Sequence, residues 1–82
     1  MTQRLSLDVL LFASWADALG ASQKVELPVG ATVADLLATL SARVVGTALP
    51  KPVVALNQRY ARPTETISAG DEVAIIPPVA GG

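Results

Sequence analysis

Few groups in this 82-residue sequence could do chemistry, and the most distinctive one lies at its last residue. The sequence has no histidine and no cysteine, which removes the most common general base, thiolate metal sites and disulfides. Its carboxylates show no evident pairing, and no GxxxxGK(S/T) phosphate loop occurs. The remaining candidate for a reactive group is the α-carboxylate of Gly82, whose reference pKa is about 3.5. An ionised carboxylate resists nucleophilic attack, so we expect another protein to activate it, for example as an acyl-adenylate.

The residues before Gly82 are suited to presenting it. Glu72–Ile76 is rich in β-branched residues and predicts a strand, which should end at the two prolines because proline donates no hydrogen bond to a sheet. Consecutive prolines favour an extended course, and glycine lets another backbone approach closely because it has no Cβ. We therefore expect a tail that inserts into a partner protein, made of Pro77, Pro78, Val79, Ala80, Gly81 and Gly82.

An apolar partner patch is expected beside this tail. Val73 and Ile75 have the parity of core residues, so Ala74 and Ile76 should face the other way, and Val79 would extend the patch. The alternative is that these are ordinary exposed residues. A second group, Lys51, Arg59 and Arg62, is more simply interpreted as solvated charges than as contacts with an acidic partner or an anionic substrate.

The length and composition indicate one small domain with a well-filled core. Of all residues 51% are hydrophobic and 16% are charged, and the mean hydropathy is +0.49, which excludes the disordered class. The net charge is −1 without a basic run, so we expect no nucleic-acid partner. No apolar run approaches the ~20 residues of a membrane span, and Asp8 makes residues 5–13 a poor signal peptide. We expect a cytoplasmic protein that does not enter a membrane.

The first half of the chain predicts two strands around a short helix. Residues 5–12 alternate at first, and the apolar pair Leu10 and Phe12 then predicts that the far end of this strand is covered on both faces. A Ser14–Asp17 capping box should start a helix of about two turns that stops at Gly20. Trp15 is interpreted as packing rather than as a ligand platform. Residues 23–27 alternate again and should pair antiparallel with the first strand.

A longer amphipathic helix and three strands follow. Thr32 with Asp35 predicts a helix start and Gly46 a stop, and the apolar face consists of Val33, Leu36, Leu37, Leu40 and Val44. Residues 53–57, 60–62 and 72–76 predict strands. The order predicts an α+β fold with a β-grasp arrangement: a mixed sheet with one main helix across it and the last strand inside the sheet. We expect the domain to span residues 1–76 and the extended Gly-Gly tail residues 77–82.

The sequence resembles the small subunit of molybdopterin synthase over nearly its whole length. The C-terminal motif carries most of this resemblance, and further similar segments are Leu10-Leu11-Phe12-Ala13, Val54-Ala55-Leu56-Asn57-Gln58 and Gly70-Asp71-Glu72-Val73. The family usually has aromatic residues where this chain has Ile75 and Ile76. The resemblance implies a ubiquitin-like β-grasp sulfur carrier, which is the non-catalytic sulfur-donor subunit of a two-subunit transferase.

The resemblance also implies a reaction sequence and partners. An ATP-dependent activating enzyme would adenylate Gly82, and a sulfur donor protein would convert it to a thiocarboxylate. The tail would then enter the large synthase subunit and donate sulfur to cyclic pyranopterin monophosphate in molybdenum cofactor biosynthesis, with two copies of each subunit in a heterotetramer. No bound cofactor is implied, only the transient covalent AMP and thiocarboxylate. The alternatives are a carrier for thiamin thiazole, tRNA thiolation or cysteine synthesis, or a ubiquitin-like protein modifier.

Overall fold

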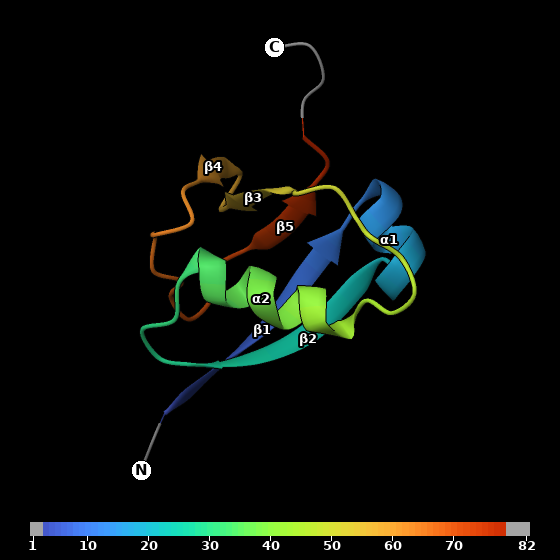
Figure 1. Ribbon diagram of the computed structural model, residues 1–82. Coiled ribbons are helices and arrows are strands. Elements are labelled where there is room, and N and C mark those ends of the chain that lie inside the picture. Colours follow the sequence, from blue (N-terminus) through green and yellow to red (C-terminus); the bar gives the residue numbers. More distant parts are fainter. Residues whose placement is uncertain (1–2, 79–82) are drawn as a thin grey trace.

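The computed structural model describes residues 3–78, which form two helices and one five-stranded sheet (Figure 1). In chain order the elements are β1 (Arg4–Leu11), α1 (Ala13–Leu19), β2 (Ser22–Pro28), α2 (Val33–Arg43), β3 (Val53–Leu56), β4 (Arg59–Ala61) and β5 (Val73–Ile76). Neither helix of this part of the chain is long and apolar enough to cross a membrane.

β1 and β2 form the longest strand pair. They run antiparallel, from Arg4 opposite Pro28 to Leu10 opposite Ser22. Every second residue of β1 is buried, as are Val25 and Leu27 of β2, so the alternation of apolar residues places one face of this pair in the core. The predicted antiparallel pairing of these two strands is confirmed.

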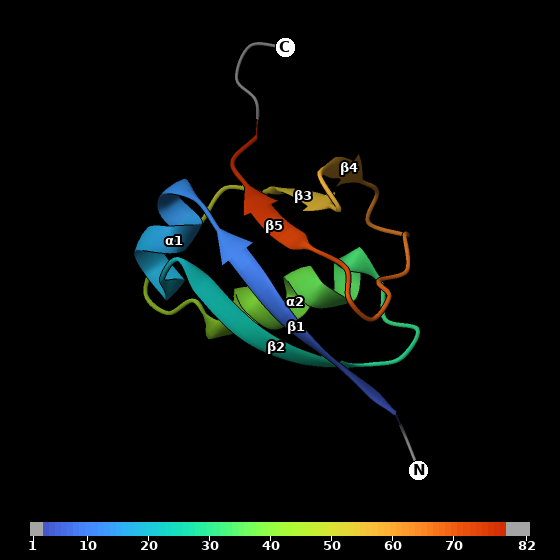
Figure 2. The same cartoon turned by 180° about the vertical axis from the view of Figure 1, so that it is seen from behind.

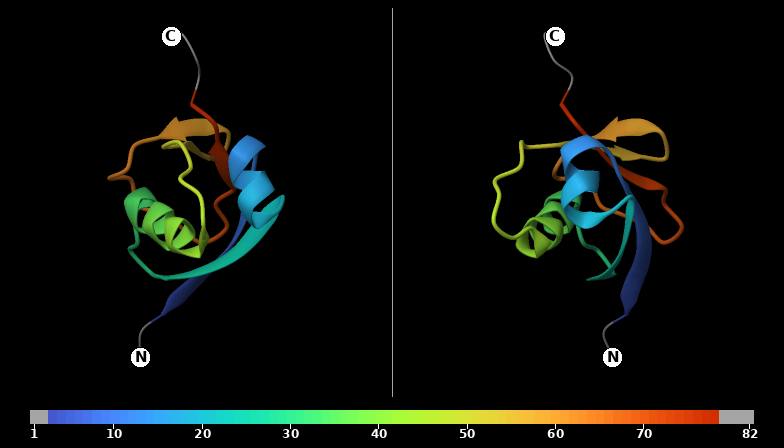
Figure 3. Two further views of the ribbon diagram at one scale, coloured as in Figure 1. Left: turned by 45° about the vertical axis from the view of Figure 1, so that its right-hand side comes forward. Right: turned by 90° about the vertical axis from the view of Figure 1, so that its right-hand side faces the viewer.

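The prediction that the far end of β1 is covered on both faces is wrong. Leu10 and Phe12 remain 41% and 48% exposed. α2 covers only one face of the sheet (Figure 3), and the view from the other side shows β1, β2 and β5 in front of α2 (Figure 2). We call the side of the sheet opposite α2 the open face.

α1 starts differently from the prediction. The expected Ser14–Asp17 capping box is wrong: the N-cap is Phe12, with no side-chain cap bond. Ala13 has φ 53°, and this left-handed residue turns the chain from β1 into the helix and leaves Ser14 within its first turn. The predicted stop at Gly20 is confirmed, where φ is 95° and the N–H donates to the Ala16 carbonyl.

α2 begins with the capping box that the sequence predicts. The Asp35 N–H donates to Thr32 Oγ1 (3.3 Å), and the Thr32 N–H donates to the Asp35 carboxylate (2.9 Å). The helix ends at Arg43, three residues before the expected stop at Gly46. Its apolar face packs over the sheet: Val33, Leu36 and Leu40 are buried and Leu37 is half-buried. Val44, the C-cap residue just past the helix, is also half-buried.

The sheet order is β2-β1-β5-β3-β4. β5 therefore lies in the middle, parallel to β1 and antiparallel to β3. β3 and β4 are joined by a two-residue turn in which Asn57 (φ 52°) and Gln58 (φ 68°) both adopt the left-handed conformation. The predicted position of the last strand inside the sheet is confirmed, and every buried side chain among residues 3–78 is hydrophobic.

Candidate functional site

The predicted tail is rooted in the centre of the sheet. Ile75 lies opposite Leu11 of β1, and Ile76 lies opposite Val53 of β3. Beyond the end of β1, the Phe12 N–H still donates to the Ile75 carbonyl (3.2 Å). The chain after β5 leads away from the sheet (Figure 1). Pairing on both sides therefore fixes the course of β5 up to Ile75, and pairing with β3 extends to Ile76.

Hydrogen bonds also hold the start of β5 in place. Asn57 Nδ2 donates to Asp71 Oδ1 (3.0 Å), and the Glu72 N–H donates to Asn57 Oδ1 (3.0 Å). The Ser68 N–H donates to the second oxygen of Asp71 (2.8 Å). These hydrogen bonds, first the one from Asn57 and then the one from Ser68, hold the pKa of the Asp71 carboxyl below its ordinary value. The β3–β4 turn thus sets the start of the strand that carries the tail.

The structure describes four of the predicted site residues. Ala74, Ile76 and Pro77 are half-buried and Pro78 is exposed. Ala74 and Ile76 lie on the open face, because the residues that alternate with them, Val73 and Ile75, are buried in the core on the side of α2. The other predicted site residues, Val79, Ala80, Gly81 and Gly82, lie outside the described residues.

Neighbouring strands extend this apolar surface. Leu10 on β1 and Ala55 on β3 lie on either side of Ala74, and Tyr60 on β4 lies opposite Ala55. Opposite residues of paired strands share a face, so they form one apolar row across the open face. A shorter row beside the tail consists of Val53, Ile76 and Phe12, the last in extended backbone just beyond β1. We define the open-face patch as Leu10, Phe12, Val53, Ala74, Ile76 and Tyr60.

The open-face patch is larger than the sequence predicted. Tyr60 is 66% exposed, in addition to the exposed Leu10 and Phe12. The break in the alternation at Leu10 and Phe12 was the available signal, but a run of apolar residues does not show whether its second face is covered by the protein itself. No comparable sequence signal marks Val53 and Tyr60, because their positions beside Ile76 and Ala55 depend on the order of the strands in the sheet.

The three basic residues singled out in the sequence, Lys51, Arg59 and Arg62, do not share one environment. Arg59 forms an ion pair with Glu65 (2.9 Å), and the Arg62 N–H donates to the same carboxylate (3.3 Å). The Arg59 guanidinium, and after it the Arg62 N–H, keep the pKa of the Glu65 carboxyl below its ordinary value. Arg59 thus has an intramolecular partner, while Lys51 lies exposed in the loop before β3.

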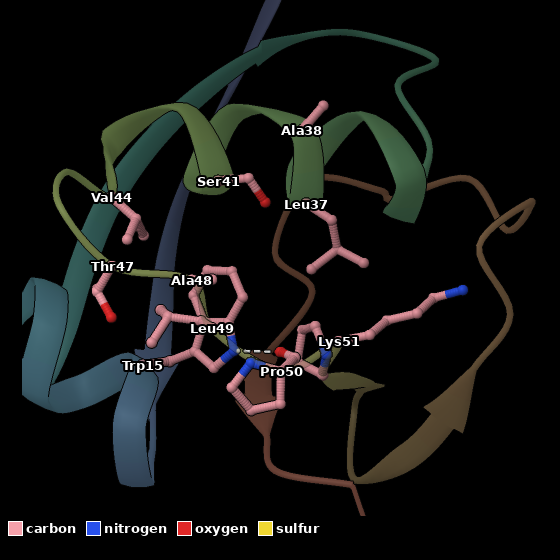
Figure 4. A pocket seen from close by; sticks show the side chains of 11 residues that line it. Trp15, Leu37, Ala38, Ser41, Val44, Thr47, Ala48, Leu49, Pro50 and Lys51 are labelled. Carbon is pink, nitrogen blue, oxygen red and sulfur yellow. Dashed lines mark hydrogen bonds between the residues drawn. The ribbon is translucent and has the colours of Figure 1, made fainter.

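A groove runs between α2 and the loop before β3 (Figure 4). Its volume is about 450 Å³, and Trp15, Leu37, Ser41 and Leu49 are among its lining residues. Trp15 is 3% exposed, and its Nε1 donates to the Pro50 carbonyl (3.1 Å). This hydrogen bond anchors the loop to the rest of the domain.

The described residues 3–78 hold no group of three or more carboxylates, histidines or cysteines that could bind a metal ion.

The arrangement of these elements, with the last strand at the centre of the sheet, is shared with known proteins. The model of the ThiS family matches residues 9–82. The chain belongs to the ThiS family. The curated molybdopterin synthase sulfur carrier subunit of Chlamydomonas reinhardtii is 41% identical over 83 residues, which cover 95% of this chain and all of that protein.

Solved structures agree with the ThiS-family assignment. Small archaeal modifier protein 1 of Haloferax volcanii superposes with a TM-score of 0.76 at 29% identity, over 92% of this chain and 99% of that one. A putative molybdopterin converting factor, subunit 1, from Pyrococcus furiosus gives 0.77 at 29% identity with the same coverage. The predicted ubiquitin-like β-grasp fold and the resemblance to the molybdopterin synthase small subunit are confirmed.

Proposed function

We propose that this ThiS-family chain is the sulfur carrier subunit of a molybdopterin synthase. The observation that carries the proposal is the 41% identity to a sulfur carrier subunit along the whole of that protein. The central, doubly paired β5 supports it, because a carrier must present its terminal group at a defined position. The reacting group in this proposal is the α-carboxylate of Gly82.

The first proposed step is adenylation by an ATP-dependent activating enzyme. A carboxylate oxygen of Gly82 attacks the α-phosphorus of ATP, pyrophosphate leaves and an acyl-adenylate forms. A hydrosulfide equivalent from a sulfur donor protein then attacks the acyl carbon, AMP leaves and a proton is lost, giving the thiocarboxylate. Both modifications are transient, and the proposed site of the reaction is the cytoplasm.

The second proposed step takes place in the large subunit of the synthase. The tail, Pro77–Gly82, enters that subunit, and the thiocarboxylate sulfur attacks a carbon of cyclic pyranopterin monophosphate and displaces an oxygen substituent, which leaves a thioester between the chain and the pterin. Water then cleaves the acyl C–S bond of this thioester, so the sulfur stays on the pterin and the carboxylate is restored. The dithiolene product contains two sulfur atoms, so two loaded carriers are consumed, in keeping with an assembly of two copies of each subunit.

The open-face patch is the proposed docking surface for the large subunit. It lies where the chain leaves β5, so docking there would orient the tail before it reaches the reacting centre. Large exposed apolar side chains such as Phe12 and Tyr60 are typical anchors of protein interfaces. Prolines at the base of the tail reduce the entropy that insertion must overcome.

Intact-mass measurement tests the activation step. The protein is incubated with the activating enzyme, ATP and the sulfur donor protein, and the expected product is heavier by the difference between one sulfur and one oxygen atom. A variant without Gly82 is the control and should stay unmodified while remaining folded. An unchanged mass of the full chain, or equal modification of the shortened chain, would contradict the proposal.

The second candidate is a protein modifier, which the likeness to a small archaeal modifier protein favours. Its activation would begin in the same way, but a lysine amine would attack the acyl carbon and form an isopeptide bond. The same incubation with added cell protein separates the two functions. Conjugates that depend on Gly82 and carry no sulfur support the modifier, whereas accumulation of the thiocarboxylate supports the carrier.

A further inference from the structure

β2 forms one edge of the sheet, and half of its backbone groups point away from β1. The Leu11 N–H donates to the Ala21 carbonyl, and the Val29 N–H donates to the Gln3 carbonyl. In an antiparallel pair the hydrogen-bonded positions recur at every second residue. The backbone groups of Lys24 and Glu26 therefore point outward, where a further strand would bind.

Two arginines occupy the outward carbonyls at the centre of this edge. Arg43, the last residue of α2, donates from Nη1 to the Lys24 carbonyl (3.0 Å). Arg4, on the open face of β1, donates from Nη2 to the Glu26 carbonyl (3.3 Å). The two guanidinium groups reach the edge from opposite faces of the sheet. Each lies where an N–H of an added strand would have to lie.

The β2 edge is also complementary to a second copy of itself. If two β2 strands pair antiparallel about Val25, Lys24 of one copy lies opposite Glu26 of the other, twice by symmetry. Both pairs have opposite charges on the open face, an arrangement that stabilises cross-strand contacts. In the same register, the backbone N–H and C=O groups of Lys24 and Glu26 would form the central hydrogen bonds. The acceptors would be the two carbonyls to which the arginines donate.

We propose that Arg4 and Arg43 close the β2 edge against antiparallel pairing with a second copy of this chain. Exposed edges that can pair are a liability that folded proteins block with charged side chains and with proline, and Pro28 at the end of β2 donates no hydrogen bond. Closing the edge keeps the protein monomeric, so that partner proteins bind at its other surfaces. This inference does not depend on the proposed function.

The test compares the double variant Arg4→Ala/Arg43→Ala with the wild type by sedimentation velocity over a wide concentration range. The matched control, Lys51→Ala/Arg62→Ala, changes the net charge equally, from −1 to −3, since each variant loses two positive charges. We expect the dimer dissociation constant of the edge variant to be at least tenfold lower than those of the control and the wild type. Arg4→Ala alone, which leaves α2 intact, should show a smaller shift in the same direction.

A charge exchange tests the register of the pairing. In the double-variant background, Lys24→Glu places like charges opposite each other and should abolish the dimer, and adding Glu26→Lys should restore it. A folded edge variant that associates no more than the control, or an Arg4→Ala variant indistinguishable from the wild type, would overturn the proposal. So would an association that is insensitive to Lys24→Glu.

Discussion

Gln58 holds a backbone conformation that its side chain disfavours. Its φ of 68° in the β3–β4 turn is left-handed, where a Cβ costs roughly 1–2 kcal/mol, and two-residue turns of this kind prefer glycine at this position. Gln58→Gly should therefore raise the free energy of unfolding by about 1 kcal/mol, allowing for the extra entropy of glycine in the unfolded chain. Urea denaturation measures the change.

The matched control at the same position is Gln58→Ala. Alanine removes the same polar side chain but keeps the Cβ, so it should not stabilise the protein. Equal stabilisation by both variants would show that the left-handed conformation is not the source of the strain.

Asp71 makes the stability of the fold depend on pH in a defined direction. Hydrogen bonds from Asn57 and Ser68 lower the pKa of the Asp71 carboxyl below its ordinary 3.8, so the ionised form stabilises the folded state. This contribution is complete above pH 3.8 and is lost as the pH falls through the lower folded-state value. Asp71→Asn should therefore destabilise the protein at neutral pH, and its deficit relative to the wild type should shrink on acidification.

Urea denaturation from pH 7 down to about pH 2 checks this prediction. Asp8→Asn, on the open face of β1, is the control because it removes a carboxylate without touching the Asn57 turn. The account of the turn is wrong if both variants show the same dependence on pH.

At the scale of elements, the starts of the two helices provide a direct comparison. The Thr32 side chain caps α2, and its replacement by alanine should cost about 1 kcal/mol of stability. Ser14 lies inside the first turn of α1 and caps nothing, so Ser14→Ala should change stability by less than about 0.5 kcal/mol. Thermal unfolding of the two variants provides the measurement, and equal losses would contradict the assignment of the caps.

Those two helix starts also show what the sequence could predict about elements. The capping box of α2 is local, because Thr32 and Asp35 bond to each other, and it was predicted correctly. The start of α1 depends on Ala13 turning left-handed after β1, and alanine gives no signal for that conformation. Alternation predicts β1 and β2, and β-branched residues predict β5. The order of the strands in the sheet follows only from the resemblance and the general sequence of elements.

At the scale of the whole molecule, the open-face patch should control partner binding and leave folding intact. Ile76→Asp and Leu10→Asp place a charge in the proposed docking surface, and each should weaken binding to the large synthase subunit by at least tenfold. Ser6→Asp is the control, because it adds the same charge to the same face of β1 but away from the tail. Isothermal titration calorimetry measures the affinity, and unchanged binding by both patch variants would refute the surface.

The candidate site was predictable only in part. Ala74 and Ile76 follow from the alternation within β5, because Val73 and Ile75 must face the core. Leu10 and Phe12 break the alternation of their strand, which is a local signal for an apolar second face. Val53 and Tyr60 join the patch through pairing between strands that are distant in the sequence. Their place is fixed by the order of the whole sheet, so no local pattern could reveal it.

The central claim is that Gly82 carries sulfur from an activating enzyme to the pterin precursor. The most direct measurement mixes the purified thiocarboxylated chain with the large subunit and cyclic pyranopterin monophosphate, without ATP, and follows intact mass and molybdopterin together. The account predicts that the chain returns to its carboxylate mass as molybdopterin forms, with two chains consumed per product. A thiocarboxylate that stays intact with this precursor while an active large subunit is present would contradict it.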